Sequence, residues 1–111
     1  MHEWIKEFPA AITVCDCEGI IIEMNDKAIA TFASDGGAEL IGKNLYDYHP
    51  AHCNKIIEKM METGGSHSYT IQKGDVKKLI HQQPWFKDGK VAGVVEMSIV
   101  IPAEMSHYVR S

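Results

Sequence analysis

The chain has 111 residues, of which 45% are hydrophobic, and its formal net charge is -4. This length fits one domain with its own core, and an acidic balance without a basic patch argues against direct binding to nucleic acid. No apolar run approaches the ~20 residues that span a bilayer, and the mixed, acidic N-terminus does not resemble a signal peptide. Cys15 and Cys17 are too close along one strand for an unstrained disulfide. We therefore expect a cytoplasmic protein in a reducing compartment.

The first eight residues predict a short amphipathic helix that precedes the main domain. Trp4, Ile5 and Phe8 fall on one side of this helix, which ends before Pro9. That side must be buried against the domain or against a second copy of the chain. Three segments follow from this pattern: an N-terminal helix over residues 1–8, a domain over 9–102 and the start of a linker over 103–111.

A β-hairpin and a helix come next. Residues 11–17 and 20–24 predict two strands that are joined by a turn at Glu18 and Gly19. Asn25 or Asp26 then caps a helix, because both side chains can accept a hydrogen bond from the backbone of the first turn.

The helix expected between residues 50 and 63 has the clearest periodicity in the chain. His49 and Pro50 open it, with proline at a tolerated first-turn position, and two glycines at 64 and 65 stop it. Apolar residues recur at the spacing of an amphipathic stripe. They are Cys53, Ile56, Ile57, Met60 and Met61.

Three strands complete the pattern. They are expected over residues 66–73, 76–86 and 91–101, and Pro84 requires an edge or a bulge within the second of them. The Asp-Gly pair in Lys87–Lys90 is a strong hairpin signal. The order strand, strand, helices, strand, strand, strand predicts an α+β domain, in which a five-stranded antiparallel sheet carries its helices packed on one face.

This order resembles the PAS domain, the small sensory module of bacterial signalling proteins. The resemblance rests on residues 16–25, Ala28, residues 40–44 and residues 87–96, and it covers roughly residues 8 to 102. It implies a PAS-like fold with a ligand cavity between the sheet and the helices. The Val-Ile-Pro step at 100–102 departs from the family's usual Asp-Ile-Thr, so the family's aspartate salt bridge is not expected.

The last strand carries apolar residues on both alternating sets, and one set also holds Glu96 and Ser98. Simple alternation favours a solvated face for Glu96, whereas the resemblance places it in the ligand cavity, and we adopt the cavity. There Glu96 receives a cationic or amide ligand, or pairs with His81 on the neighbouring strand. The expected ligand-binding residues are Glu96, His81, Ser98, Val94, Tyr46, Ile57 and Met60.

His49, His52 and Cys53 form the candidate metal site. Two imidazoles three residues apart with an adjacent thiol can ligate zinc, copper or iron. In haem-binding PAS domains the axial histidine lies in the long helix before the third strand, and the comparable position here is near Cys53. The competing interpretation is exposed histidines at a helix start and a core thiol. We adopt the second and expect no cofactor, with haem or a metal as the alternative.

These patterns predict a sensory domain that binds a small ligand and forms a homodimer. No catalytic motif is present, so we do not expect an enzyme. The alternatives are a haem- or metal-bearing redox or gas sensor, and a ligand-free interaction domain. We expect either an excised sensor or a stand-alone one, with a signalling effector as a fused or separate partner. We do not expect a membrane as a partner. The expected dimer contact comprises Trp4, Ile5, Phe8, Val95, Met97 and Ile99.

Overall fold

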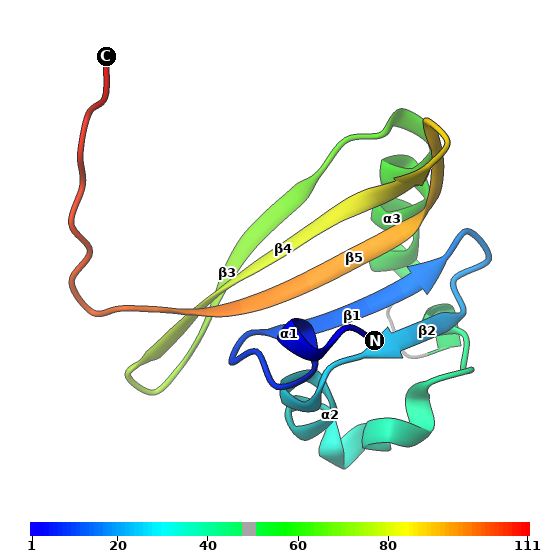
Figure 1. Ribbon diagram of the computed structural model, residues 1–111, viewed down its shortest axis with the longest axis horizontal. Coiled ribbons are helices and arrows are strands. Elements are labelled where there is room, and N and C mark those ends of the chain that lie inside the picture. Colours follow the sequence, from blue (N-terminus) through cyan, green and yellow to red (C-terminus); the bar gives the residue numbers. More distant parts are fainter. Residues whose placement is uncertain (48–50) are drawn as a thin grey trace.

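The computed structural model describes residues 1–47 and 51–111, with the side chains of residues 51–53 left aside. Its sheet has five antiparallel strands in the order β2-β1-β5-β4-β3, so the α+β prediction is confirmed (Figure 1). The strands are β1 (Ala11–Asp16), β2 (Ile21–Met24), β3 (His67–Lys73), β4 (Val76–Lys87) and β5 (Lys90–Ile101). The helices are α1 (Glu3–Lys6), α2 (Asp26–Thr31), α3 (Ala51–Thr63) and three 3-10 turns, η1 (Ala33–Asp35), η2 (Gly37–Leu40) and η3 (Leu45–Asp47).

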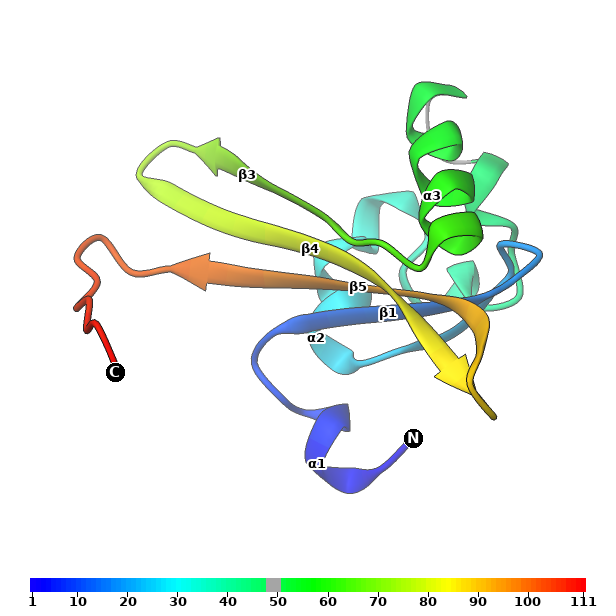
Figure 2. The same ribbon diagram turned by 90° about the horizontal axis from the view of Figure 1, so that it is seen from above.

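The helices are divided unequally between the two faces of the sheet. The segment from α2 to α3 covers one face, whereas the single turn of α1 lies on the opposite side of β1 and β5 (Figure 2). The hydrophobic core fills the space under the covered face, because the apolar stripe of α3 and the inward residues of β1 and β5 meet there. Its buried members are Ala11, Cys15, Ile21, Met24, Ala28, Leu40, Leu45, Ile57, Met60 and Val94.

Asn25 connects the two sides of the molecule. Its side chain is fully buried, with 0% exposure, and caps α2 by accepting from the amide of Ala28. Its Oδ1 also accepts from the amide of Ile12, at 2.9 Å. Its Nδ2 donates to three backbone carbonyls of the N-terminal segment, at Ile5, Phe8 and Ala10. One side chain thereby ties α1, β1 and α2 together, and the buried amide leaves neither of its polar atoms unpaired.

The approach of β5 to β1 requires a glycine at position 93. A Cβ there would collide with the carbonyl oxygen of Cys15 and lie 2.6 Å from Nε1 of Trp85. The indole of Trp85 lies in the space that the missing side chain leaves, and its Nε1 donates a hydrogen bond to the carbonyl oxygen of Cys15 at 2.9 Å. Trp85 on β4 therefore reaches across β5 to β1, and Gly93 allows the crossing.

Both predictions about β4 are confirmed. Pro84 pairs with Val94 of β5 but lies beyond the last residue that pairs with β3, so it occupies an edge position. The following hairpin turns through Asp88 and Gly89, which both have positive φ angles of 52° and 78°. Such a pair is the signature of the primed turns that match the right-handed twist of adjacent strands.

The sheet extends beyond the helices at one end. The β3–β4 hairpin and the end of β5 project past α2 and α3 in both views (Figures 1 and 2). Tyr69, Ile71, Val76 and Val100 are exposed along this projection. After Ile101 the chain continues to Ser111 without helix or strand. Among the described residues, no helix combines the length and the apolar character that crossing a membrane requires.

Candidate functional site

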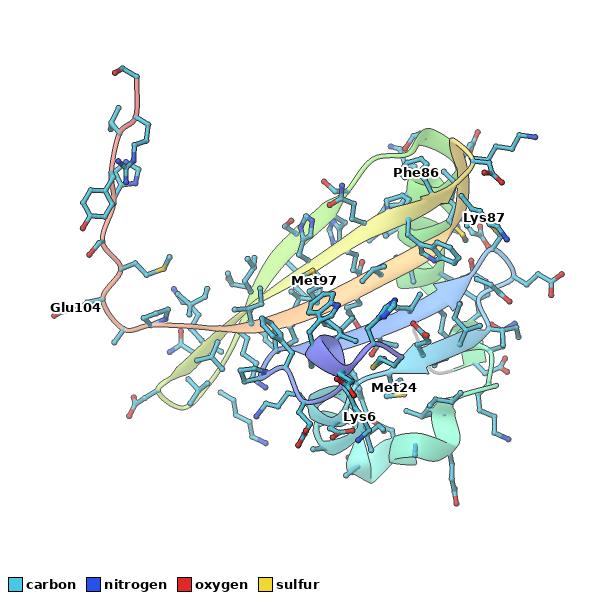
Figure 3. All side chains as sticks on the ribbon, viewed as in Figure 1. Lys6, Met24, Phe86, Lys87, Met97 and Glu104 are labelled. Atoms are coloured by element: carbon cyan, nitrogen blue, oxygen red, sulfur yellow. The ribbon has the colours of Figure 1, made fainter. Side chains whose placement is uncertain are left out.

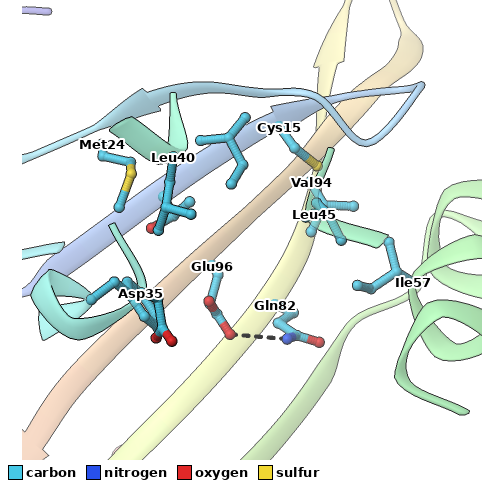
Figure 4. Close-up of a pocket in the computed structure, with 12 residues that line it drawn as sticks. Cys15, Met24, Asp35, Leu40, Leu45, Ile57, Gln82, Val94 and Glu96 are labelled. Atoms are coloured by element: carbon cyan, nitrogen blue, oxygen red, sulfur yellow. Dashed lines mark hydrogen bonds between the residues drawn. The ribbon is translucent and has the colours of Figure 1, made fainter. Parts of the chain in front are cut away.

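A cavity of about 150 Å³ lies between the sheet and the helical segment (Figure 4). Strands β1, β2, β4 and β5 form its floor, and the segment from α2 to α3 forms its walls. A water-free cavity of roughly this volume accommodates a molecule the size of benzene. The lining residues are Thr13, Cys15, Ile21, Met24, Phe32, Asp35, Leu40, Leu45, Ile57, Gln82, Val94 and Glu96.

Most of the cavity surface is apolar, and the two carboxylates and the amide lie along one side of it. Ile21, Leu45 and Ile57 are buried members of the apolar lining. The carboxylates of Asp35 and Glu96 lie on the same side of the cavity, next to the amide of Gln82 (Figure 4). A few convergent polar groups in an otherwise apolar hollow are typical of a site that binds a small molecule.

Glu96 and Gln82 form a hydrogen-bonded pair across β5 and β4. They are direct partners in the strand register, and Nε2 of Gln82 donates to Oε1 of Glu96 at 3.0 Å. Gln82 is 7% exposed and Glu96 is half-buried. The described ion pair of the molecule joins Lys6 to Asp26, away from this site, so no described cation neutralises Glu96. A half-buried carboxylate with only an amide partner is poised to accept a further donor.

Asp35 reaches the cavity from the helical side. It ends η1 and is exposed, so its carboxylate lies at the mouth of the cavity. The turn that places it requires Gly36 and Gly37, whose φ angles are 126° and 54°. The amide of Gly37 donates to the carbonyl of Phe32 at 2.9 Å and closes the turn. Residues with a Cβ are strained at such angles, so the two glycines allow the turn that follows Asp35.

Cys15 contributes a thiol from the floor of the cavity, on β1. Burial raises its pKa above the ordinary value, because a thiolate is poorly solvated there. Cys17, by contrast, is exposed at the end of the same hairpin, where its Sγ lies 3.3 Å from the carbonyl oxygen of Val91. The protonated Cys15 thiol therefore behaves as part of the apolar lining.

The structure places the predicted ligand-binding residues in three positions. Val94, Ile57 and Glu96 line the cavity. Ser98 lines a neighbouring groove that also includes Glu96. Tyr46 and Met60 pack in or against the core and are not among the lining residues. Burial raises the pKa of the Tyr46 phenol, with the charge of Glu58 adding to the shift. Their part in ligand binding stays a prediction.

The prediction that His81 lies in the cavity and pairs with Glu96 is wrong. His81 pairs with Met97 in the register and faces the other side of the sheet. Its Nδ1 lies 2.6 Å from Oγ of Ser68, and its Nε2 lies 2.9 Å from Oε1 of Gln83. Because side chains alternate along a strand, the neighbouring Gln82 takes the place beside Glu96.

Sequence reasoning missed four polar residues of the cavity: Thr13, Cys15, Asp35 and Gln82. Gln82 follows from the strand register once the bulge between Trp85 and Phe86 is known. Asp35 had a weaker indication, since the Asp-Gly-Gly sequence predicts a turn without saying where the carboxylate points.

The predicted dimer residues lie on α1 and on the open face of β5. Trp4 is 69% exposed, and its ring meets that of Phe8 edge to face, with centroids 6.3 Å apart. Met97 lies on the side of β5 that Figure 3 faces. Ile99 is exposed, and Val95 and Met97 are half-buried. This face is apolar along β5, and the single turn of α1 lies on its side of the sheet. The neighbouring strands contribute polar side chains to it, namely those of His81, Ser68 and Gln83. Its part in a dimer stays a prediction.

The candidate metal site cannot be placed, because His49 and the side chains of His52 and Cys53 lie outside the described residues. Within the described part of the chain, no group of three or more His, Cys, Asp or Glu side chains is arranged to hold a metal ion. The haem or metal alternative therefore stays an untested prediction.

Comparison with protein families gives one match. The model of the PAS fold family matches residues 5–104. No curated protein sequence matches the chain.

Solved structures share the architecture at low sequence identity. The Aer2 receptor of Vibrio cholerae, a dual PAS-haem oxygen sensor, is 23% identical with a TM-score of 0.63, covering 84% of this chain and 95% of its own. A sensory box sensor histidine kinase of Vibrio cholerae is 14% identical with a TM-score of 0.64, covering 90% and 88%. VqmA of Vibrio cholerae is 15% identical with a TM-score of 0.71, covering 90% of this chain and 51% of its own. These likenesses show the fold, and this chain spans about half of VqmA.

Proposed function

The chain belongs to the PAS fold family, and from that premise we propose that it is a sensory module that binds a small ligand in the cavity between sheet and helices. PAS domains occur in receptors and sensor kinases, as the structural neighbours illustrate. The observation that carries the proposal is the combination of an apolar cavity of about 150 Å³ with carboxylate and amide groups along one side. Such a hollow holds a ligand by its hydrocarbon part and orients it by its polar part.

The proposal includes a route from ligand to output through β5. Val94 and Glu96 of this strand line the cavity. The strand ends at Ile101, and the chain continues through Pro102 into the exposed C-terminal segment. A ligand that binds two positions of β5 with unequal affinity shifts the balance between them. The displacement then reaches whatever effector the C-terminal segment contacts.

Dimerisation through the open face is the second part of the proposal. The apolar side chains of Trp4, Phe8 and Ile99 are exposed there, and Val95 and Met97 are half-buried beside them, on the side of the sheet that carries the single turn of α1. Removing such surface from water favours association by roughly 25 cal/mol per Å² of apolar area. Two copies that meet through this face place their β5 strands near one another, which supports joint output.

The test compares one substitution on the two faces of β5. Val94→Phe fills the cavity from its floor, whereas Val95→Phe makes the same change on the next residue, toward the open face. Toluene, titrated into ¹⁵N-labelled protein, serves as the probe. We expect it to shift the amide signals of lining residues in the natural chain and in Val95→Phe, and not in Val94→Phe.

Either of two results would overturn the ligand proposal. If toluene leaves the lining residues of the natural chain unshifted while the amide spectrum is that of a folded domain, the cavity accepts no ligand of the size it was proposed to hold. If Val94→Phe binds toluene as well as the natural chain does, the ligand site lies elsewhere.

A further inference from the structure

We propose that the ligand of this cavity is a small organic cation, a primary amine with a compact hydrocarbon group. The inference rests on the proposed function, since it names the class of molecule that the same cavity takes. Three observations support the inference: the charge of the lining residues, the hydrogen-bonding groups of the cavity that have no described partner, and the cavity volume.

The charge of the lining is negative. Two of its residues are carboxylates, Glu96 and Asp35, and none is Lys, Arg or His. Lys78 lines the neighbouring groove, which Glu96 also borders, but no described ion pair joins it to Glu96 and it does not line the cavity. Two like charges beside an apolar hollow repel an anionic ligand and attract a cation, and partial burial strengthens both effects relative to water. A carboxylate or phosphate ligand is therefore disfavoured here.

Most hydrogen-bonding groups that remain open along the polar side of the cavity are acceptors. The exception is the hydroxyl of Thr13, the partner of Glu96 across β1 and β5, which can donate as well as accept. Nε2 of Gln82 is already bonded to Glu96, so the amide has its carbonyl oxygen Oε1 left, for which no described residue supplies a donor. Gln82 is 7% exposed, and its Oε1 stays accessible to a donor that enters the cavity. Glu96 has a second carboxylate oxygen, and Asp35 offers two more at the mouth. An ammonium group, which has three donors and no acceptor, matches this set.

An alcohol or a neutral amide matches the set less well. A hydroxyl group donates one hydrogen bond, and an amide brings a carbonyl oxygen that would face the carboxylates. Hydrogen bonds between an ammonium and a carboxylate are shorter and about twice as strong as those between neutral groups. The polar side therefore discriminates by the charge and donor count of the ligand.

The apolar lining limits the size of the hydrocarbon part. Ile21, Leu45, Ile57 and Val94 bound it, and all four are buried. A volume of about 150 Å³ holds a benzene-sized group, which corresponds to an amine of roughly six to eight non-hydrogen atoms. A branched or cyclic group fills such a hollow better than a long chain, because unfilled space forfeits contacts.

The experiment separates ligand charge from ligand shape. The probes are 3-methylbutan-1-amine, 3-methylbutan-1-ol and 4-methylpentanoate, which share the 3-methylbutyl group and carry a cation, a neutral hydroxyl and an anion. Each is titrated at pH 7.5 into ¹⁵N-labelled protein, and affinity is read from the amide signals of the lining residues. We expect the amine to bind roughly 10- to 100-fold more tightly than the alcohol, and the anion to bind most weakly.

Two variants locate the effect. Glu96→Gln keeps a partner for Gln82 but removes the charge, and we expect it to bring amine affinity down to about that of the alcohol. Asp35→Asn acts at the solvated mouth, and we expect a loss of about threefold there. The controls Glu23→Gln on β2 and Asp75→Asn in the β3–β4 turn change exposed residues outside the cavity, and amine affinity should not change in them.

The outcomes distinguish this inference from the proposed function. If toluene binds and the alcohol or the anion equals or exceeds the amine, the cavity is a ligand site but the amine class is wrong. If the amine preference survives both Glu96→Gln and Asp35→Asn combined in one variant, the charge that selects it lies outside the cavity and the inference also fails. If neither toluene nor any of the three probes shifts the lining residues, the proposed function fails with it.

Discussion

The two faces of β5 reverse the usual distribution of polar and apolar side chains in a sheet. Val94, Glu96 and Ser98 point toward the helices, and two of these three are polar. Val95, Met97 and Ile99 point the other way, and all are apolar although the described helix on that side is only the single turn of α1. In an ordinary half-covered sheet the covered face is apolar and the open face is polar.

The reversal assigns a separate function to each face. A carboxylate under the helices is unfavourable in an empty core, so its presence beside a cavity indicates a partner that arrives from outside. An apolar surface without cover is likewise unfavourable in an isolated domain. Local rules are typically violated where a protein binds something, and β5 violates them on both sides. The variants below test whether the two faces are independent.

Asn25→Ala is expected to have the largest effect, because Asn25 holds the N-terminal segment of the open face to β1 and α2. The substitution removes five hydrogen bonds and leaves buried backbone groups unpaired. We expect a loss of about 3 kcal/mol or more in the free energy of unfolding, measured by urea denaturation.

Asn44→Ala is the matched control for Asn25. Its side chain is half-buried and makes two hydrogen bonds, to the amide of Tyr46 and the carbonyl of Glu18. We expect it to lower the free energy of unfolding by about 1 kcal/mol. Equal losses in the two variants would contradict the view that Asn25 joins the two sides of the molecule.

Gly93→Ala is expected to come second, because it affects both faces through the backbone of β5. The added Cβ collides with the carbonyl oxygen of Cys15 and displaces the indole of Trp85 from it. We expect a loss of about 2 kcal/mol in the free energy of unfolding. Gly74→Ala controls for the positive φ angle alone, since nothing lies within 4 Å of its Cβ, and should lose about 1 kcal/mol. An equal loss in both would mean that β1 and β5 separate without penalty.

The strand order and the turn residues made most of the fold predictable. Asp88 and Gly89 adopt the positive φ angles that an Asp-Gly hairpin requires, and the apolar stripe of α3 packs in the core through Ile57 and Met60. These are local rules, and each depends on a few neighbouring residues. The short helix at the N-terminus was expected for the same reason, although α1 forms only a single turn between Glu3 and Lys6.

The site was less predictable because it depends on register. A hairpin that pairs Phe86 with Val91 without interruption would place His81 opposite Glu96, which is one of the two arrangements predicted for Glu96. A bulge between Trp85 and Phe86 shifts the pairing by one residue and places Gln82 there instead. Since side chains alternate, one residue of shift exchanges the faces of the strand. No local pattern marks the bulge, which lies next to the point where Trp85 crosses Gly93.

Met97→Lys tests the open face on its own. Met97 lies at the centre of that face, paired with Ile12 and His81 on the two neighbouring strands. A lysine there must be desolvated if two copies meet, so we expect the dimer dissociation constant to rise about tenfold or more, equivalent to ~1.4 kcal/mol. Analytical ultracentrifugation measures it. Val100→Lys, on the opposite face of β5, should leave the constant unchanged, and an equal effect of both would place the contact elsewhere.

Cys15→Ala has the smallest expected effect and tests whether the cavity side of the sheet excludes water. Burial raises the pKa of the Cys15 thiol above its ordinary value of 9.0, so the folded state keeps the proton at a pH where the unfolded chain releases it. The stabilisation is complete below pH 9 and is lost as the pH rises above that value, by at most about 1.4 kcal/mol per pH unit. Urea denaturation between pH 8 and pH 10 should show a steeper decline for the natural chain than for Cys15→Ala. Cys17→Ala, on an exposed residue, should retain the decline of the natural chain. If Cys15→Ala also retains it, water reaches the thiol, and the cavity floor is wetter than its apolar lining implies.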